Sequence, residues 1–214
     1  MTGKYGAVET VPAEDFKARV LNCHLGGKVY VIEGSLIVTG DDLDAVPPVD
    51  VAPDKIVSAP SGENGSGTVV IKSGDLYIYN DLEYDDSAMG PLDRLSRLAS
   101  LGWIVLDEND PEKPGYNQRG NIFVGKDVTH LVGSFLSTGQ SGFFSVAPPA
   151  TDSPKPLLVE GLVVARQFHL SRSYKSLEQG SESVAYDGRA VANPPPGFED
   201  VTKTMPAFGD LPAP

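Results

Sequence analysis

Four stretches of the chain carry apolar residues at every second position, and each contains at least one glycine. They span residues 29–40, 69–84, 119–139 and 157–174. This spacing is typical of a β-strand that buries one face, because successive side chains in a strand point to opposite sides. The sequence therefore predicts an all-β fold built mainly from these strands.

Glycines border or interrupt these strands at uneven intervals, which argues against a fixed repeat length. We interpret them as corners or as points of close backbone approach; they are Gly34, Gly74, Gly120, Gly133 and Gly161. Irregular corners indicate a mainly parallel β-solenoid, or β-helix, whose turns differ in length and stack over one core. An ordinary β-sandwich with glycine turns is the alternative.

One of these corners makes a direct prediction about stability. Gly133 is expected to turn the chain from one face of the solenoid to the next. A change to valine should then introduce strain of roughly 1–3 kcal/mol. The same change at Gly65, in an expected loop, should have little effect.

Two segments depart from the strand pattern and favour short covering helices. At 10–21, Pro12 suits the first helical position, and Phe16 and Val20 lie one turn apart. At 91–101, leucines fall on one helical face and Gly102 suits the stop.

Proline and glycine mark the remaining segments. Residues 41–67 contain four prolines and a glycine-rich run, so we expect a long loop there. Residues 1–198 then form a single domain, and 199–214 an extended Pro-rich C-terminal tail that follows three consecutive prolines. Phe198 and Phe208 are expected to hold this end of the chain against the body.

Composition and charge narrow the function. The chain has 23 glycines, 18 prolines and 40% hydrophobic residues, which suits a turn-rich, strand-rich fold. A net charge of −12 and scattered basic residues disfavour nucleic acid as a partner. No run of 18 apolar residues is present, so we expect no direct membrane insertion by this segment. The start MTGKYGAVET lacks the features of a secretory signal. The protein is then cytoplasmic, unless an export signal or anchor precedes Met1.

Candidate chemistry is sparse. Acidic clusters at 41–44, 81–86 and 107–110 are candidates for a calcium-binding site. They lack the spacing of an EF-hand loop, so solvent-exposed turns between strands are the simpler interpretation. The histidines are isolated, and Cys23 is expected to be a small buried hydrophobe. We therefore predict no catalytic residue, no metal site and no cofactor.

The main enzymatic rival is a carbohydrate-active β-helix, which places carboxylates and basic groups along a groove. The residues that fit such a groove are Asp75, Asp81, Glu83, Asp127, Arg166 and Arg172. Enzymes of this kind are usually longer solenoids, which favours a non-enzymatic protein.

The second half of the chain carries a succession of motifs: a G-x-I-x-V strand, a V-x-x-L-x-G turn, a strand ending in L-x-R, and a Y-D-x-R…PPPG tail. The matching residues are Gly120, Ile122, Val124, Val128, Leu131, Gly133, Gly161, Leu170, Arg172, Tyr186, Asp187, Arg189 and 194–197. This succession, over about residues 98–198, resembles the C-terminal region of uncharacterised bacterial envelope proteins that often carry a pilin-like anchor. The glycine-centred strands are also loosely similar to bactofilin-type polymer-forming solenoids.

The resemblance implies a structural or adhesive module at the bacterial surface, associated with a type IV pilus. Its partners would be other envelope or pilus proteins, or further copies of itself. A self-polymerising filament subunit is the first alternative. In either case Asp187 and Arg189 suit a charge pair, or a hydrogen bond from Arg189 to a neighbouring carbonyl, that holds the tail against the last turn; ordinary surface charges are the alternative. Arg172 suits bonds to carbonyls at a solenoid end.

Overall fold

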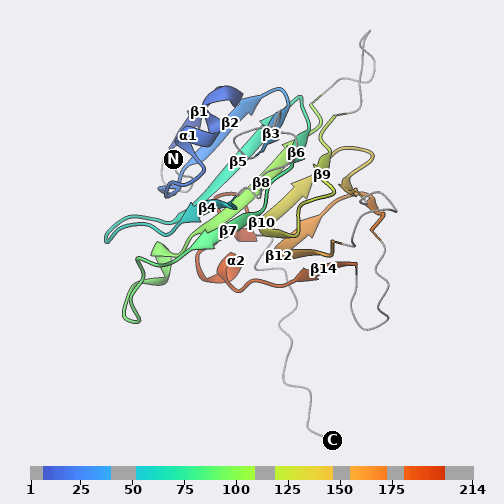
Figure 1. The fold of residues 1–214 in the computed structure, drawn as a ribbon. Coiled ribbons are helices and arrows are strands. Elements are labelled where there is room, and N and C mark those ends of the chain that lie inside the picture. Colours follow the sequence, from blue (N-terminus) through green and yellow to red (C-terminus); the bar gives the residue numbers. More distant parts are fainter. Residues whose placement is uncertain (1–6, 40–51, 109–118, 147–154, 173–180, 201–214) are drawn as a thin grey trace, which may run out of the picture.

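The computed structural model describes residues 7–39, 52–108, 119–146, 155–172 and 181–200, and nearly all of its regular structure is β-strand (Figure 1). Sheet A has seven strands, in the order β1 (Val8–Thr10), β2 (Val29–Glu33), β5 (Ser66–Lys72), β8 (Ser100–Leu106), β10 (His130–Ser137), β12 (Leu157–Val164) and β14 (Glu182–Ala185). Sheet B has five, in the order β13 (Phe168–Leu170), β11 (Phe143–Ser145), β9 (Ile122–Val124), β6 (Leu76–Ile78) and β3 (Leu36–Val38). Sheet C pairs β4 (Asp54–Val57) with β7 (Leu82–Asp85).

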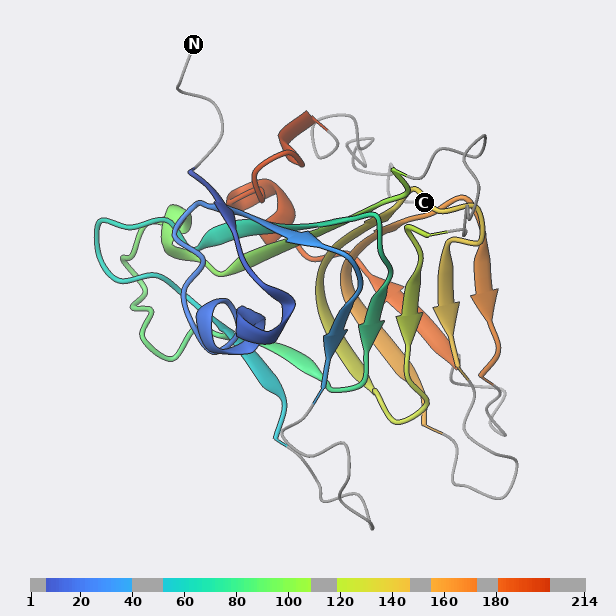
Figure 2. The ribbon, with the colours of Figure 1, turned by 90° about the horizontal axis from the view of Figure 1, so that it is seen from above.

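The chain alternates between the sheets as it advances. From β2 onward, a strand in sheet A is followed by one in sheet B, and the chain then returns to sheet A. We call each such circuit, from one strand of sheet A to the next, a pass. The first two passes also contain a strand of sheet C. Each return lies beside the strand of the previous pass, and the strands of sheet B form a parallel row (Figure 2). Every pairing among the described strands is parallel. This confirms the expected all-β, mainly parallel class, whereas β-sandwiches are built from antiparallel sheets.

The core is a set of columns that run from one pass to the next. Ile32 pairs with Ile71, and Ile71 with Val105, all three without solvent exposure. Alternation within each strand turns these residues inward, so stacking the passes buries one continuous apolar interior. Trp103 lies fully buried between Phe16 and Phe135, with ring centroids 5.7 and 6.4 Å away.

The first predicted helix is shorter than expected. The 3-10 helix η1 (Ala13–Asp15) and α1 (Phe16–Arg19) occupy part of 10–21, while Thr10 belongs to β1. Phe16 on α1 is buried, and the helix lies at the β1 end of the stack, away from β14 (Figure 1). The helix therefore covers one end of the core, as the sequence indicated.

The second predicted helix, at 91–101, is wrong. Only the 3-10 helix η2 (Leu95–Arg97) forms there, Leu92 and Leu95 are 97% and 60% exposed, and β8 already begins at Ser100. Pairing of Leu101 with Gly67 in sheet A outweighs the local helical spacing.

The predicted loop at 41–67 is also wrong in part, because it contains β4 and the start of β5. β4 forms because it pairs with β7 over four residues, a contact that local composition does not reveal. Residues 40–51 and 201–214, with Phe208 among them, lie outside the described part of the chain.

Candidate functional site

Three of the predicted corner glycines stack at the corner between sheets A and B. Gly34 and Gly120 have φ of +88° and +81°, which favour glycine. The N–H of Gly120 donates to the carbonyl of Gly74 over 2.8 Å. A Cβ on Gly74 would lie 2.1 Å from the carbonyl carbon of Gly34. These positions therefore combine a turn with close backbone approach.

Gly133 and Gly161, by contrast, are not corners. They lie inside β10 and β12 and pair directly with each other, with φ of +131° and +149°. A Cβ on Gly161 would lie 1.8 Å from the Gly133 oxygen, and one on Gly133 would lie 3.5 Å from the Trp103 ring. Glycine here lets two strands and an indole approach closely. The tolerance predicted for Gly65 is also contradicted, because a Cβ there would lie 2.2 Å from the Arg97 carbonyl oxygen.

A ladder of polar side chains runs along the corner beside the stacked glycines. Asp75 Oδ1 accepts from the backbone N–H of Asn121 over 3.0 Å and from its Nδ2 over 3.1 Å. Asn121 Oδ1 accepts from the N–H of Gly142 over 3.0 Å, and Ser35 Oγ accepts from the N–H of Asp75 over 3.1 Å. Asp75, a candidate for an enzymatic groove, is 5% exposed and holds this polar ladder together.

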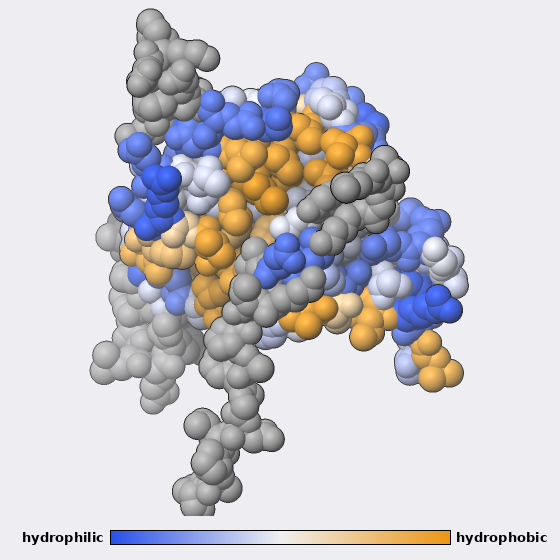
Figure 3. Space-filling view, turned by 180° about the vertical axis from the view of Figure 1, so that it is seen from behind, coloured by the Kyte–Doolittle hydropathy of each residue, from blue (hydrophilic) through white to orange (hydrophobic). Residues whose placement is uncertain are grey.

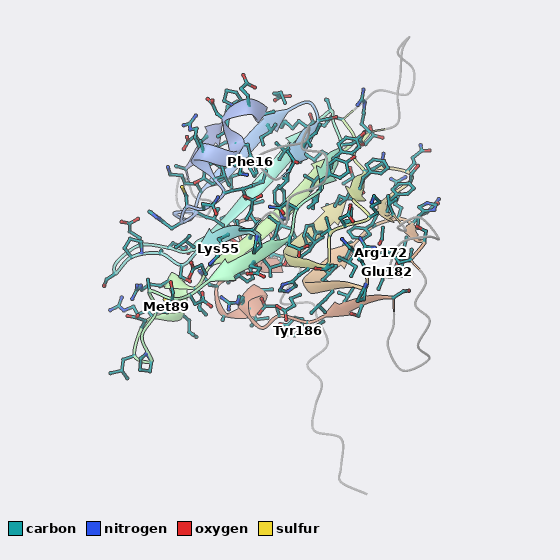
Figure 4. All side chains as sticks on the ribbon, in the orientation of Figure 1. Phe16, Lys55, Met89, Arg172, Glu182 and Tyr186 are labelled. Atoms are coloured by element: carbon teal, nitrogen blue, oxygen red, sulfur yellow. The ribbon has the colours of Figure 1, made fainter. Side chains whose placement is uncertain are left out.

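Arg172 occupies a second corner, where sheet B leads back to sheet A. Its Nη1 donates to the carbonyls of Val128 (2.5 Å) and Lys155 (3.0 Å), and its Nη2 to that of Gly125 (2.7 Å). Its N–H donates to Glu182 Oε1 over 2.8 Å, and Figure 4 shows the two residues side by side near β14. Burial lowers the pKa of Arg172, and nearby carboxylates oppose that shift. These contacts to carbonyls match the role predicted for Arg172.

Two further groove candidates lie near Arg172 and are also engaged. Asp81 Oδ1 accepts from the N–H groups of Thr129 (2.6 Å) and His130 (3.1 Å). Asp127 pairs with Lys155 over 2.9 Å, and this hydrogen bond lowers the pKa of Asp127 against the effect of burial.

The remaining groove candidates are Glu83 and Arg166. Glu83 lies 3.9 Å from Nδ1 of His130, and Arg166 is exposed on the surface. The structure thus brings Asp81, Asp127 and Arg172 to one region and uses all three to hold neighbouring passes, while Asp75 belongs to the polar ladder.

Sequence reasoning missed an aromatic ladder on the outer face of sheet B. Tyr77, Phe123, Phe144 and His169 stack in sequence, with ring centroids 5.0, 4.7 and 4.4 Å apart and planes within 14°. Each occupies the middle of a three-residue strand (LYI, IFV, FFS and FHL). That recurring central ring was the available signal.

The geometry of the aromatic ladder limits what it can bind. The rings share their faces with one another, so each inner ring presents mainly its edge to solvent. A flat ligand such as a sugar ring therefore cannot stack on Phe123 or Phe144. Burial raises the pKa of Tyr77, and the carboxylate of Asp75 adds to the rise.

The segment 188–198, here called the strap, crosses back from β14 toward the early passes. Arg189, on α2 (Arg189–Ala192), binds Asp86 at 3.0 Å (Nη1–Oδ1) and 2.5 Å (Nη2–Oδ2). Its guanidinium lies 4.5 Å from the centroid of the Tyr84 ring, and burial raises the pKa of Tyr84. Arg189 also pairs with Asp187 over 3.4 Å, as predicted. The predicted attachment to the last turn is wrong, because Arg189 reaches the second pass.

The far end of the strap packs on sheet A. Asn193 Nδ2 donates to the carbonyls of Ser96 and Leu98, and Thr68 Oγ1 donates to that of Pro196 over 2.6 Å. Phe198 is 1% exposed and covers Gly102, where a Cβ would lie 2.5 Å from its ring. The expected packing of Phe198 is confirmed. Gly102 is not a helix stop, since it lies within β8.

The remaining candidates offer no assembled site. Cys23 is only partly buried, contrary to the prediction, and His24 pairs with Glu63 over 2.8 Å at the surface. Among the described residues, no three His, Cys, Asp or Glu side chains are grouped so as to hold a metal ion. The acidic cluster at 41–44 and part of that at 107–110 lie outside the described residues.

Comparison with known proteins gives no further guide. No protein-family model matches the chain, and no curated protein or solved structure matches it either. None of the helices in the described ranges is long and apolar enough to cross a membrane.

Proposed function

We propose that the chain is a β-solenoid that acts as a non-enzymatic structural or adhesive module at a bacterial cell surface, as part of a type IV pilus-associated protein. The alternation of the chain between stacked parallel sheets supports the solenoid. The surface location and the pilus association rest on the motif resemblance, and the partners proposed are other envelope or pilus proteins.

One observation carries the structural role. The side chains best suited to chemistry form hydrogen bonds between passes: Asp75 with Asn121, Asp81 with Thr129, and Arg172 with three carbonyls. A hydrolase or lyase needs carboxyl groups directed at a shared substrate. Groups engaged in this way stabilise a scaffold instead.

The molecular surface supports a contact function. Seen from behind, apolar residues gather into a patch bordered by hydrophilic ones (Figure 3). Contiguous apolar patches of this kind are typical of protein interaction sites. An adhesive or assembly role uses such a surface directly.

The test of location uses the organism's own cells. An antibody against the module should label intact cells, and added protease should degrade the protein without lysis. A cytoplasmic protein of known location serves as the control. Protection of the module until the cells are lysed would overturn the surface assignment and favour the cytoplasmic filament.

The test against enzymatic activity is a screen on plant and bacterial polysaccharides, with and without calcium. We expect no turnover. Turnover that is abolished by Asp127→Asn, a change at a partly exposed ion pair, would establish the carbohydrate-active alternative.

A further inference from the structure

The two ends of the stack differ in how they are closed. At the β1 end, Val11, Phe16, Val20, Leu21 and Leu25 are at most 2% exposed, so the core is covered. At the β14 end, Phe168, Leu170 and Val184 are 49%, 53% and 59% exposed. Their partners in the preceding pass are at most 2% exposed: Phe143, Ser145 and Val159. The described residues therefore leave one layer of core-facing side chains open to solvent.

The same end also leaves two other features incomplete. β13 pairs with β11 on one side, and no described strand pairs with its other edge. The aromatic ladder stops at His169, which stacks on Phe144 with one face and is exposed. An unpaired strand edge beside exposed apolar side chains is a template for another strand.

We propose that two copies of this chain associate tail to tail through β13, in an antiparallel pair centred on His169. This inference rests on the proposed solenoid and does not depend on where in the cell it acts. It yields a closed dimer, because at the opposite end the core-facing side chains of the terminal strand β3, Leu36 and Val38, are 1% exposed and offer no apolar layer for the same contact. It therefore separates this protein from the filament subunit considered above.

β13 is complementary to itself in this arrangement. With His169 opposite its own copy, Phe168 lies opposite Leu170 of the partner subunit, and Leu170 opposite the partner's Phe168. The side chains that face the core then meet on one side of the new sheet, as period two requires. On the other side the two His169 rings meet, so the aromatic ladder continues from one copy into the next.

Charge permits the contact although each copy carries −12. Residues 165–172, which include β13, contain no Asp or Glu. Arg172 directs its guanidinium at carbonyls of its own chain, and it is 5% exposed. No carboxylates therefore face each other across the paired β13 strands. Arg166 falls opposite Arg172 of the partner subunit in this register, but Arg166 is exposed, so its charge stays solvated. A two-fold arrangement also pairs the free β13 edges of both copies in one contact, whereas an unrelated strand would pair the edge of only one copy.

The first experiment measures the mass of the full chain by sedimentation and light scattering over a range of concentrations. We expect a monomer–dimer equilibrium with nothing larger. Phe168→Lys should shift it to monomer, while Leu92→Lys and Val8→Lys, at exposed apolar residues elsewhere, should leave it unchanged. Circular dichroism confirms that each variant is folded. A monomeric wild type, open-ended growth, or equal dissociation by Val8→Lys would overturn the proposal.

The second experiment tests the register. In a Cys23→Ser background, His169→Cys should form an intermolecular disulfide under mild oxidation, because directly opposed residues in an antiparallel pair have Cα atoms about 4.5–5.5 Å apart. Phe144→Cys, on the same ladder one strand further in, should not. Equal cross-linking of the two variants would contradict the register.

The outcomes also distinguish the two proposals. Protease protection on intact cells would overturn the surface role and leave the dimer standing. A monomer in solution would overturn the dimer and leave the surface role standing.

Discussion

Individual glycines matter most where two strands touch. Gly161 combines a φ of +149° with a Cβ position 1.8 Å from the Gly133 oxygen, so no side chain fits without displacing a neighbouring strand. Gly188 has a φ of −61°, and no atom lies within 4 Å of its Cβ position. Substitutions at these two positions therefore compare a glycine that a neighbouring backbone touches with one that has open space around it.

Gly161→Ala should lower the free energy of unfolding by at least about 2 kcal/mol, through backbone strain and overpacking. The melting temperature should fall by about 4 °C or more in a domain of this size. Gly188→Ala should change it little. Equal melting temperatures for the two variants, measured by circular dichroism, would contradict the close contact of β10 with β12.

Arg172 is the buried cation whose loss should cost most. Arg172→Met leaves the carbonyls of Gly125, Val128 and Lys155 without this donor, which should cost about 3 kcal/mol. Arg166→Met, at an exposed site, is the control and should stay within about 0.5 kcal/mol of wild type. Denaturant unfolding measures both. A difference below about 1 kcal/mol would show that these bonds contribute little.

Among the elements, the strap is held in part by the ion pair between Asp86 and Arg189. Burial alone would raise the pKa of Asp86, but hydrogen bonds from Arg189 and Ser58 outweigh it, so the folded pKa lies below the ordinary value of 3.8. A carboxylate with a lowered pKa stabilises the fold above its ordinary pKa, and that contribution disappears as pH falls through the folded value.

Unfolding free energy should therefore decrease below about pH 4, and part of this decrease should come from the strap. In Arg189→Met, which removes the partner of Asp86, the decrease should be smaller. Denaturant titrations between pH 6 and pH 3 provide the comparison. The same slope in both proteins would show that the Asp86–Arg189 pair does not contribute.

For the molecule as a whole, one apolar core connects the covering helix with the stacked strands. Trp103, the one tryptophan in the sequence, lies on β8 and contacts Phe16 from the covering helix and Phe135 from β10. The covering end and the middle passes therefore share one packed interior, and we expect them to unfold together.

Tryptophan emission should start blue-shifted, because the ring is fully buried, and should move to the red in a single transition. That transition should coincide with the loss of the β signal in circular dichroism. In Phe16→Ala both signals should shift together to lower denaturant, since the truncated ring leaves a cavity beside Trp103. Two separated transitions would mean that the β1 end unfolds on its own.

The amino-acid sequence was sufficient for the features that repeat at short range. Period-two spacing revealed β2, β5, β10 and β12, because a strand with one buried face has to alternate. Gly34, Gly74 and Gly120 were recognised as corners, since glycine alone readily adopts a positive φ, as at Gly34 and Gly120, or admits a backbone as close as the one beside Gly74. The carbonyl contacts of Arg172 were also foreseen, because Arg172 follows Leu170 at strand spacing and a guanidinium at the end of a strand can donate to several carbonyls.

Only the tertiary structure decided features that depend on partners distant in sequence. β4 forms because β7 lies beside it, although the prolines around it predicted a loop. β8 begins at Ser100 because β5 lies beside it, although the leucine spacing there predicted a helix. Gly133 proved to be a close-approach position because Gly161 and Trp103 pack against it, and Arg189 reaches Asp86, 103 residues away. The aromatic ladder arises because parallel register places rings from four passes in one column. Register between distant strands follows from loop lengths and packing, which no local window of sequence contains.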